Sequence, residues 1–271
     1  MPFIPTARFM VRLISFITIF ALIIFWERIA PKRKNHIPRT KRWPINIGAV
    51  VLNQLLIKIL IPFSAIEIAL ITTSNNWGIL HQITIDSNLK IIIGLLLLDL
   101  SIYFQHLCFH YIPILWRFHQ IHHLDQEFDL TTGIRFHPIE IIISLFYKFA
   151  IIIFLGITPF QVLIFEIILN AMAMFNHGNI RLPFLVDKYL RIILVTPDMH
   201  RVHHSVLPKE FNRNFGFNFS FWDRLFKTYK ADSQAGQLKM QIGQIDYPDF
   251  NQTGALRLLT LPFITRRKNS E

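Results

Sequence analysis

The sequence predicts an all-α fold: a polytopic transmembrane helical bundle with a cytoplasmic helical cap that carries a cluster of histidines. Three observations predict it. Five apolar runs are each long enough to cross a bilayer as a helix, which takes about 20 residues. The loops between these runs differ sharply in their content of basic residues. Ten of the twelve histidines fall at the predicted cytoplasmic ends of the runs or in the adjoining segments.

The composition is that of a membrane protein. Residues of the set AVILMFWYC make up 52% of the chain and charged residues only 17%, too few to cover a soluble domain of this size. The net charge of +11 lies between the apolar runs, as the positive-inside rule expects, so we expect no nucleic-acid partner. The single cysteine, Cys108, excludes an intrachain disulfide and a Cys-ligated iron–sulfur cluster.

The predicted spans follow from the apolar runs. No small-residue cleavage site follows the first run, so we expect it to remain as a transmembrane helix. The last two runs are separated only by residues 156–159 and predict a tight helical hairpin, which need not cross the bilayer fully. The five runs cover residues 9–26, 45–71, 89–112, 139–156 and 158–176.

Loop charges orient the predicted bundle. The segment 72–88 contains no Lys or Arg, as expected of a loop on the outer side. Counting crossings then places the N-terminus outside, and the segments after the third and fifth runs on the cytoplasmic side. The basic loop between the first two runs agrees with this orientation, since it contains Arg28, Lys32, Arg33, Lys34, Arg39, Lys41 and Arg42.

Three histidine clusters have helical spacing. His106 and His110 form an i, i+4 pair, so their rings point to one side of a helix. Two further clusters follow the pattern HxxHH, and each is expected to form a three-toothed comb on one helical face. A ninth histidine follows the fifth run. The nine candidate metal ligands are His106, His110, His119, His122, His123, His177, His200, His203 and His204.

The number of imidazoles predicts two metal ions. Neutral imidazole suits first-row metals such as iron and zinc. One tetrahedral or octahedral ion takes about 4–6 ligands, so eight or nine rings exceed the needs of a single ion. We therefore expect the cap to carry a His-rich di-metal site. His36 and His81 lie apart from the clusters and are expected to be ordinary interface residues.

Other polar residues are candidates for supporting roles. His137 precedes a proline, which favours an extended backbone, so it is as readily a supporting or substrate-facing residue as a ligand. Asp99 lies seven residues before His106 and could accept the second N–H of a ligand imidazole, or make a polar contact between helices. Glu140 is either such a support or a first-turn helix residue. Further candidates are Asn176, Asn179, Asp198 and Asp223.

At these residues the chain resembles the fatty acid hydroxylase / sterol desaturase superfamily of membrane di-iron enzymes, whose pattern is HxxxH or HxxxxH followed by two HxxHH boxes. The resemblance runs from about residue 98 to residue 229. Lys227 stands where the family usually has Gly, a departure that affects a turn and not the histidines. Besides the histidine clusters, the matching segments are 135–140 (RFHPIE), 176–179 (NHGN), 196–205 (TPDMHRVHHS), 214–216 (NFG) and 221–229 (FWDRLFKTY).

The resemblance implies an integral membrane oxidoreductase in which two His-ligated Fe²⁺ ions use O₂ to hydroxylate or desaturate a C–H bond of a lipid. No GxGxxG fingerprint is present, so electrons should come from an external carrier of the ferredoxin or cytochrome b5 type. We expect the chain to divide into three segments: N-terminal membrane helices with a basic loop (1–97), a catalytic domain (98–230) and a basic C-terminal tail (231–271).

Two alternatives come from other classes of protein. A membrane cytochrome with b-type haem needs only axial histidine pairs, which leaves most of these histidines unexplained. A non-catalytic lipid or metal transporter would place ionisable residues near the bilayer midplane, whereas these lie at one face. A zinc metalloprotease is disfavoured because no HExxH occurs. The lipid, the choice between hydroxylation and desaturation, the donor and the oligomeric state stay open; the Ile-rich composition hints at a bacterial inner membrane.

Overall fold

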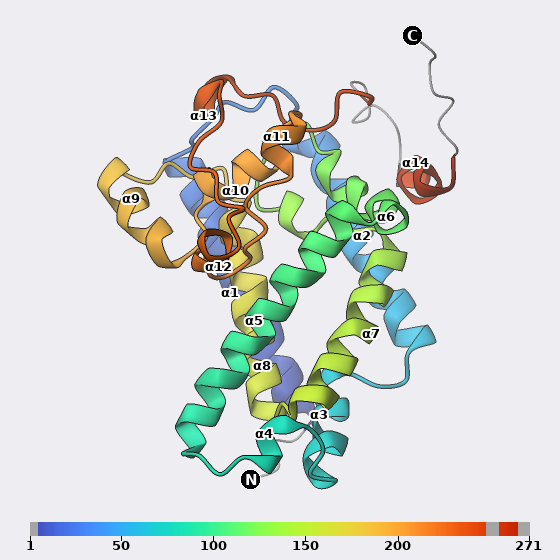
Figure 1. Ribbon diagram of the computed structural model, residues 1–271. Helices are drawn as coiled ribbons and strands as arrows, with labels where there is room; N and C mark the ends of the chain where they lie inside the picture. The colour runs from blue at the N-terminus through green and yellow to red at the C-terminus, as the bar shows by residue number, and fades with distance from the viewer. Residues whose placement is uncertain (1–4, 248–254, 265–271) are drawn as a thin grey trace.

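The structure, a computed structural model, describes residues 5–247 and 255–264. Within these residues the secondary structure is helical apart from three isolated β-bridges. The predicted all-α membrane bundle is confirmed (Figure 1). The helices long and apolar enough to cross a membrane are α1 (Pro5–Ile29), α2 (Arg39–Leu60), α5 (Ser87–Tyr111), α7 (Pro138–Leu155) and α8 (Pro159–Asn176).

The second apolar run is two helices, whereas the sequence predicted one continuous run over 45–71. Helix α2 ends at Leu60, and α3 (Ala65–Ser74) begins five residues later. Pro62 has no N–H to continue a helix, and the residue before it, Ile61, takes an extended conformation. Ser64 then starts α3 with a capping box, because its side chain accepts from Glu67 N while the Glu67 carboxylate accepts from Ser64 N.

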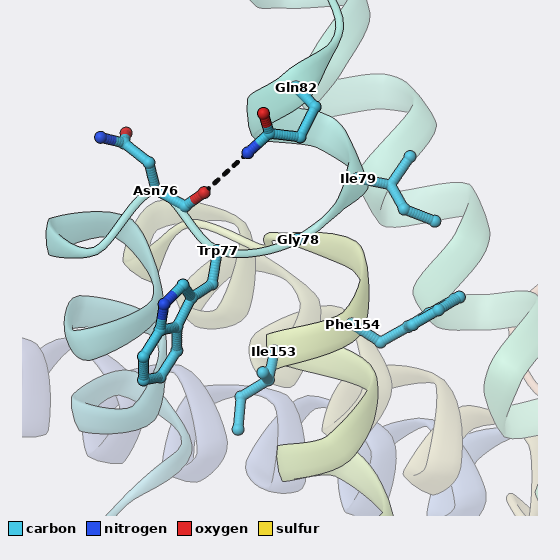
Figure 2. Close-up of a pocket in the computed structure, with 7 residues that line it drawn as sticks. All are labelled: Asn76, Trp77, Gly78, Ile79, Gln82, Ile153 and Phe154. Atoms are coloured by element: carbon cyan, nitrogen blue, oxygen red, sulfur yellow. Dashed lines mark hydrogen bonds between the residues drawn. The ribbon is translucent and has the colours of Figure 1, made fainter.

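The predicted hairpin between α7 and α8 is present and packs against the loop that follows α3. Gly156 ends α7 with φ of 80°, a left-handed conformation that favours glycine. Gly78 approaches it so closely that a Cβ at Gly78 would lie 2.1 Å from the Gly156 nitrogen. Figure 2 shows Gly78 near Ile153 and Phe154 of α7. These residues line a shallow hollow together with Asn76, Trp77 and the short helix α4 (Ile79–Gln82). The hollow lies at the end of the bundle opposite the histidines.

The bundle core and the bundle surface are both apolar. Helix α1 packs along α8, and α3 packs against α7 and α8. Ala69, Ile152 and Ile157 are fully buried in this core. On the outside, Ile59 is 76% exposed and Phe154 is 63% exposed. Outward apolar side chains of this kind are expected when lipid, not water, surrounds the helices.

A cap of short helices covers the end of the bundle where α1, α5 and α8 finish (Figure 1). Its last part, α14 (Ala255–Thr260) and η3 (Leu261–Phe263), packs against α2 and α6. The division into three segments stays a prediction, and the basic residues 266–268 of the expected tail lie outside the described residues. The remaining cap elements are α6 (Pro113–His123), η1 (Thr132–Ile134), α9 (Phe184–Ile193), α10 (Pro197–His203), α11 (Pro208–Phe211), α12 (Phe221–Leu225) and α13 (Gly236–Lys239).

Candidate metal centre

Helices α5 and α6 bring the first two histidine clusters together. Helix α5 ends at Tyr111, and Ile112 takes an extended conformation before Pro113 opens α6 at its first position. The two helices therefore meet at a sharp corner and pack against each other. The histidines at the end of α5 then face those at the end of α6: the His106 and His119 rings are 5.1 Å apart between centroids.

The third cluster is placed by α10, and the ninth histidine by the end of α8. Thr196 caps α10 by accepting from Met199 N, and Pro197 occupies its first turn. His177 is the C-cap of α8, and its ring centroid lies 4.4 Å from that of His200. Segments more than 90 residues apart in sequence, from His106 to His204, thus converge at one end of the bundle.

The nine predicted histidines form two buried groups. In each group the candidate ligand atoms all lie within 4.8 Å of one another, a spacing that suits binding to a single ion. We call them group 1 and group 2. Group 1 consists of His106, His110, His119, His123 and His203, and group 2 of His122, His177, His200 and His204.

Each HxxHH cluster is shared between the groups, which corrects the expectation of a single comb on one helical face. His119 and His123 belong to group 1, whereas His122 belongs to group 2. The third cluster divides the other way, since His203 belongs to group 1 whereas His200 and His204 belong to group 2. Successive residues of an α-helix point about 100° apart, so adjacent histidines face different centres while i, i+4 pairs stay together.

In group 2 the Nε2 atoms of the four rings converge. The Nε2 atom of His177 lies 3.1 Å from the Nε2 atoms of His122, His200 and His204. His177 Nδ1 donates to the Ala173 carbonyl at 2.7 Å, so the Nε2 of a neutral ring carries a lone pair. His122 Nδ1 likewise donates to the Arg135 carbonyl. The Nε2 lone pairs of His177 and His122 are therefore 3.1 Å apart, and they repel each other unless a cation lies between them.

Group 1 shows the same arrangement. His106 Nδ1 donates to the Phe215 carbonyl at 2.9 Å, and His203 Nδ1 donates to the Arg213 carbonyl at 2.7 Å. His119 Nδ1 donates to Glu140 Oε1 at 2.6 Å. Metal-binding histidines characteristically donate their second N–H to a carbonyl or carboxylate in this way. Among the described residues, no hydrogen-bond partner is present for the buried Nε2 atoms of His110, His119, His123 and His203. The residues of both groups therefore fit metal ions.

Burial keeps these imidazoles neutral. Desolvation lowers the pKa of His203 to about 3, although its bond to the Arg213 carbonyl acts in the opposite direction. Desolvation, followed by repulsion from neighbouring histidines, lowers the pKa of His200 and His204 well below the ordinary value. The same causes lower the pKa of His122 and His123. A neutral ring offers the lone pair that a metal ion requires.

These low pKa values predict that the metal-free protein loses stability in mild acid. Unfolded imidazoles titrate near a pKa of about 6.5, whereas the folded ones resist protonation to much lower pH. The unfolded state therefore binds more protons below about pH 6.5, so the stabilisation is present above that pH and is lost as the pH falls. We expect the thermal midpoint in detergent to decrease from about pH 7.5 to about pH 5.5. A His36→Ala, His81→Ala double variant should show the same decrease; an unchanged midpoint in both proteins would contradict the burial of neutral rings.

Three predicted supporting residues act on a loop and not on a ring. Asp99 accepts from the backbone N–H groups of Asn218 and Phe219 and, at 2.8 Å, from Trp222 Nε1. It therefore makes no bond to an imidazole, contrary to one expectation. Asp223 accepts from Phe215 N at 2.7 Å and from Gly216 N at 2.8 Å. Asn176 Nδ2 donates to the Phe217 carbonyl at 2.6 Å. Together they fix the loop whose carbonyls bind His106 and His203.

The other candidates lie outside both groups. His137 caps α7, since its Nδ1 accepts from Ile139 N and its Nε2 donates to the Leu259 carbonyl at 3.2 Å. Asp198 pairs with Lys32 and Arg201. Asn179 Oδ1 accepts from Arg33 N, which attaches the basic loop to the end of α8. His36 and His81 also belong to neither group.

Sequence reasoning missed most of the partners of the rings. The carbonyls of Arg213 and Phe215 carry no side-chain signal. The Asn212 side chain, whose Oδ1 lies 3.3 Å from His110 Nδ1, is not among the predicted supporting residues. Glu140 was left open between a support and a helix-start residue. Its position in the first turn of α7, three residues after His137, gave no means of choosing between the two.

Replacing Glu140 with glutamine is expected to weaken metal binding by about 10–100-fold. A carboxylate that accepts the second N–H of a ligand imidazole fixes the orientation of the ring and raises its basicity. Glu140 is 3% exposed and holds His119 Nδ1. The measurement is metal retention during titration with a chelator, which does not require turnover. Glu127→Gln is the matched control, since Glu127 is also buried in the cap but accepts only from backbone N–H groups. Equal retention in both variants would show that Glu140 merely fills space.

Comparisons with known proteins agree with this geometry. The chain is 30% identical over 142 residues to ornithine lipid hydroxylase OlsE of Rhizobium tropici, which covers 52% of this chain and 41% of that protein. It is 26% identical over 141 residues to human alkylglycerol monooxygenase, covering 50% and 29%. It is 28% identical over 146 residues to human cholesterol 25-hydroxylase, covering 53% and 52%. The matched region thus spans about half of these relatives or less, and no solved structure matches the chain.

The family assignment rests on a match to a family model, and the matched region includes all nine histidines. The fatty acid hydroxylase family model matches residues 91–228, about half of the chain. Those residues contain the whole of groups 1 and 2 and the loop that supports them. The resemblance found in the sequence is thereby confirmed, and the chain belongs to the fatty acid hydroxylase family.

Proposed function

We propose that this membrane protein is an O₂-dependent lipid hydroxylase that binds one iron ion in each of groups 1 and 2. The observation that carries the proposal is the pair of buried histidine groups, in each of which the candidate ligand nitrogens lie close together. An unactivated C–H bond needs an oxidant that no amino-acid side chain provides, and a bound iron pair supplies it. The reaction R–H + O₂ + 2e⁻ + 2H⁺ → R–OH + H₂O balances with two external electrons.

The relatives favour hydroxylation over desaturation. Those reported above are named a hydroxylase or a monooxygenase, acting on an ornithine lipid, an alkylglycerol or cholesterol. These substrates share an apolar chain or ring system and differ in the polar part. We therefore infer a lipid substrate and leave its polar group open. A b-type cytochrome or a transporter would leave the second histidine group without a role.

The protein's own residues position the rings and exclude water. Phe136 stacks on the His122 ring with centroids 4.6 Å apart, and Phe128 stacks on His177 at 5.4 Å. Phe215 packs against His110 at 5.1 Å. These aromatic rings close the space around the groups, so the low polarity of the site strengthens the electrostatic interactions within it.

Electrons are proposed to come from a separate acidic carrier of the ferredoxin or cytochrome b5 type. The chain has one cysteine and no GxGxxG fingerprint, so it lacks the usual means of binding a Cys-ligated cluster or a nicotinamide. Basic side chains on the cap could steer such a carrier, and this attraction would weaken with salt. The exposed ones at α11 and just after it are Lys209 and Arg213.

The histidine end of the bundle is proposed to face the cytoplasm. This orientation is supported by the charge asymmetry of the loops, since residues 72–88 contain no Lys or Arg. A cysteine in place of exposed Ser87 should react with a membrane-impermeant thiol reagent in intact cells, and one in place of Lys230 should react only after the membrane is opened. The reverse labelling pattern would place the metal centre on the outer side.

The proposed reaction is tested with the full chain in lipid vesicles, iron, ¹⁸O₂, NADPH and a ferredoxin–reductase pair. Ornithine lipid, alkylglycerol and cholesterol serve as separate substrates. We expect one ¹⁸O atom in the product of at least one substrate, and no product when the carrier is omitted. His204→Ala should abolish the product, and His81→Ala should not. Absence of ¹⁸O in all three lipids at full iron loading would count against these hydroxylation reactions, and turnover without a carrier would exclude the donor requirement.

A further inference from the structure

Helix α9 presents an apolar face that no described part of the chain covers. Phe184 is 77% exposed, Leu185 61%, Tyr189 62% and Ile193 58%. Val186 and Ile192 extend the same surface. We call these six residues the α9 face. Four of them, Leu185, Val186, Tyr189 and Ile193, line a shallow and almost wholly apolar hollow together with Leu190 and Leu194. So large an exposed apolar surface marks a site of interaction with lipid or protein.

The polar side of α9 is turned toward the cap. Asp187 is 7% exposed and forms an ion pair with Arg191 one turn later. Arg191 also donates to the Ala231 carbonyl at 2.9 Å, which ties the helix to the cap. The exposed cations beside the α9 face are Lys188 and Arg181. The helix therefore has an inward polar side, an outward apolar side and positive charge at its border, the pattern of helices that lie at a membrane surface.

The hydrogen bonds at the two ends of α9 indicate how deep the helix lies relative to the membrane. The segment before it is bonded to the end of α1, since Arg181 N donates to the Ala30 carbonyl at 2.8 Å. The end of α9 is bonded to the loop that precedes α12: Ser220 N donates to the Ile193 carbonyl at 2.9 Å. That loop is held by Asp99, seven residues before His106 in α5. At 1.5 Å per residue, Asp99 lies about 10 Å from His106 toward the membrane centre.

We propose that α9 is inserted into the membrane leaflet at the histidine end of the bundle, with the α9 face among the acyl chains and Lys188 and Arg181 at anionic headgroups. The helix begins at the level where α1 leaves the membrane and ends nearer the middle of α5. Insertion by about 5–10 Å is usual for such helices. The α9 face is thus a continuation of the lipid-facing surface of the bundle. The proposal does not depend on the reaction catalysed.

The test measures depth with a fluorescent label. Bimane is attached to a single cysteine at Ile193 or Leu185, in a Cys108→Ser background, and the full chain is placed in vesicles of phosphatidylcholine and phosphatidylglycerol. Leu238 is the matched control, because it is apolar and 66% exposed but lies in α13 on the cap (Figure 1). Unchanged metal content per chain shows that each labelled protein is folded.

We expect a doxyl-labelled lipid to quench the Ile193 label several-fold more than the Leu238 label, with Leu185 intermediate. Aqueous iodide should give the opposite order. Iodide quenching of Ile193 equal to that of Leu238 would place α9 in water and overturn the proposal. Protection of Ile193 from both quenchers, together with disulfide formation between Ile193→Cys chains, would identify a second copy of this chain as the occupant instead.

Discussion

Alanine in place of His177 is expected to reduce bound metal from about two ions per chain to about one and to lower hydroxylation by at least about 100-fold. The Nε2 atom of His177 lies 3.1 Å from each of the other three Nε2 atoms in group 2. Group 1 contains none of these four rings. The loss should therefore fall on one ion, while the other group keeps all five of its histidines.

Elemental analysis of iron-loaded, detergent-purified protein measures the stoichiometry, and the assay with ¹⁸O₂ measures turnover. His137→Ala is the matched control, since His137 is 4% exposed and lies close to α6 but belongs to neither group. It should keep both ions. Two ions in His177→Ala would show that His177 is not a ligand, and one ion in the unmodified protein would contradict the two-metal proposal itself.

The membrane fold could be predicted from the sequence because its signals are local. Four of the five apolar runs appear as helices within a few residues of their expected bounds, and Gly156 and Thr158 mark the hairpin that the short spacer predicted. The break after Leu60 was missed because Pro62 and Ser64 interrupt a run that stays apolar on both sides. A hydropathy average does not detect such a break, because it does not register that Pro62 lacks the backbone N–H needed to continue the helix.

The candidate site could be predicted only as a set of residue types. Helical spacing identifies which histidines share a helix, but the division into two groups depends on how α5, α6, α8 and α10 meet, which is tertiary information. The basic loop is a second example. Arg42 was counted as a loop cation, yet it is 2% exposed and bonded to Asp125 and Asp129 beneath group 2. Charge patterns give the orientation but not the partner of each charge.

This buried ion network joins α2 to the segment that follows α6. Asp125 is fully buried and accepts from Arg42 Nε at 2.8 Å and Nη2 at 2.6 Å. Burial alone would raise the pKa of Asp125, but Arg42 outweighs it and holds the pKa at about 2. Thr132 and Asn46 also donate to this carboxylate. Arg135 Nη1 lies 3.9 Å from the Asp125 carboxylate. The backbone carbonyl of Arg135 accepts the hydrogen bond from His122 Nδ1.

Asp125→Ala is expected to lower the free energy of unfolding by about 3–5 kcal/mol, because it leaves the buried Arg42 charge only partly compensated by Asp129. The measurement is unfolding in mixed micelles with increasing dodecyl sulfate. Lys32→Met is the matched control: its partner Asp198 keeps Arg201, and the Lys32 side chain is 18% exposed, so about 1 kcal/mol or less should be lost.

A double variant separates charge from shape. Arg42→Met with Asp125→Leu removes both charges and keeps apolar volume, so it should recover most of the stability that Asp125→Ala loses. If the double variant is less stable than Asp125→Ala, the hydrogen bonds of Thr132 and Asn46 to the carboxylate, and not the pairing of charges, hold α2 beneath the metal centre.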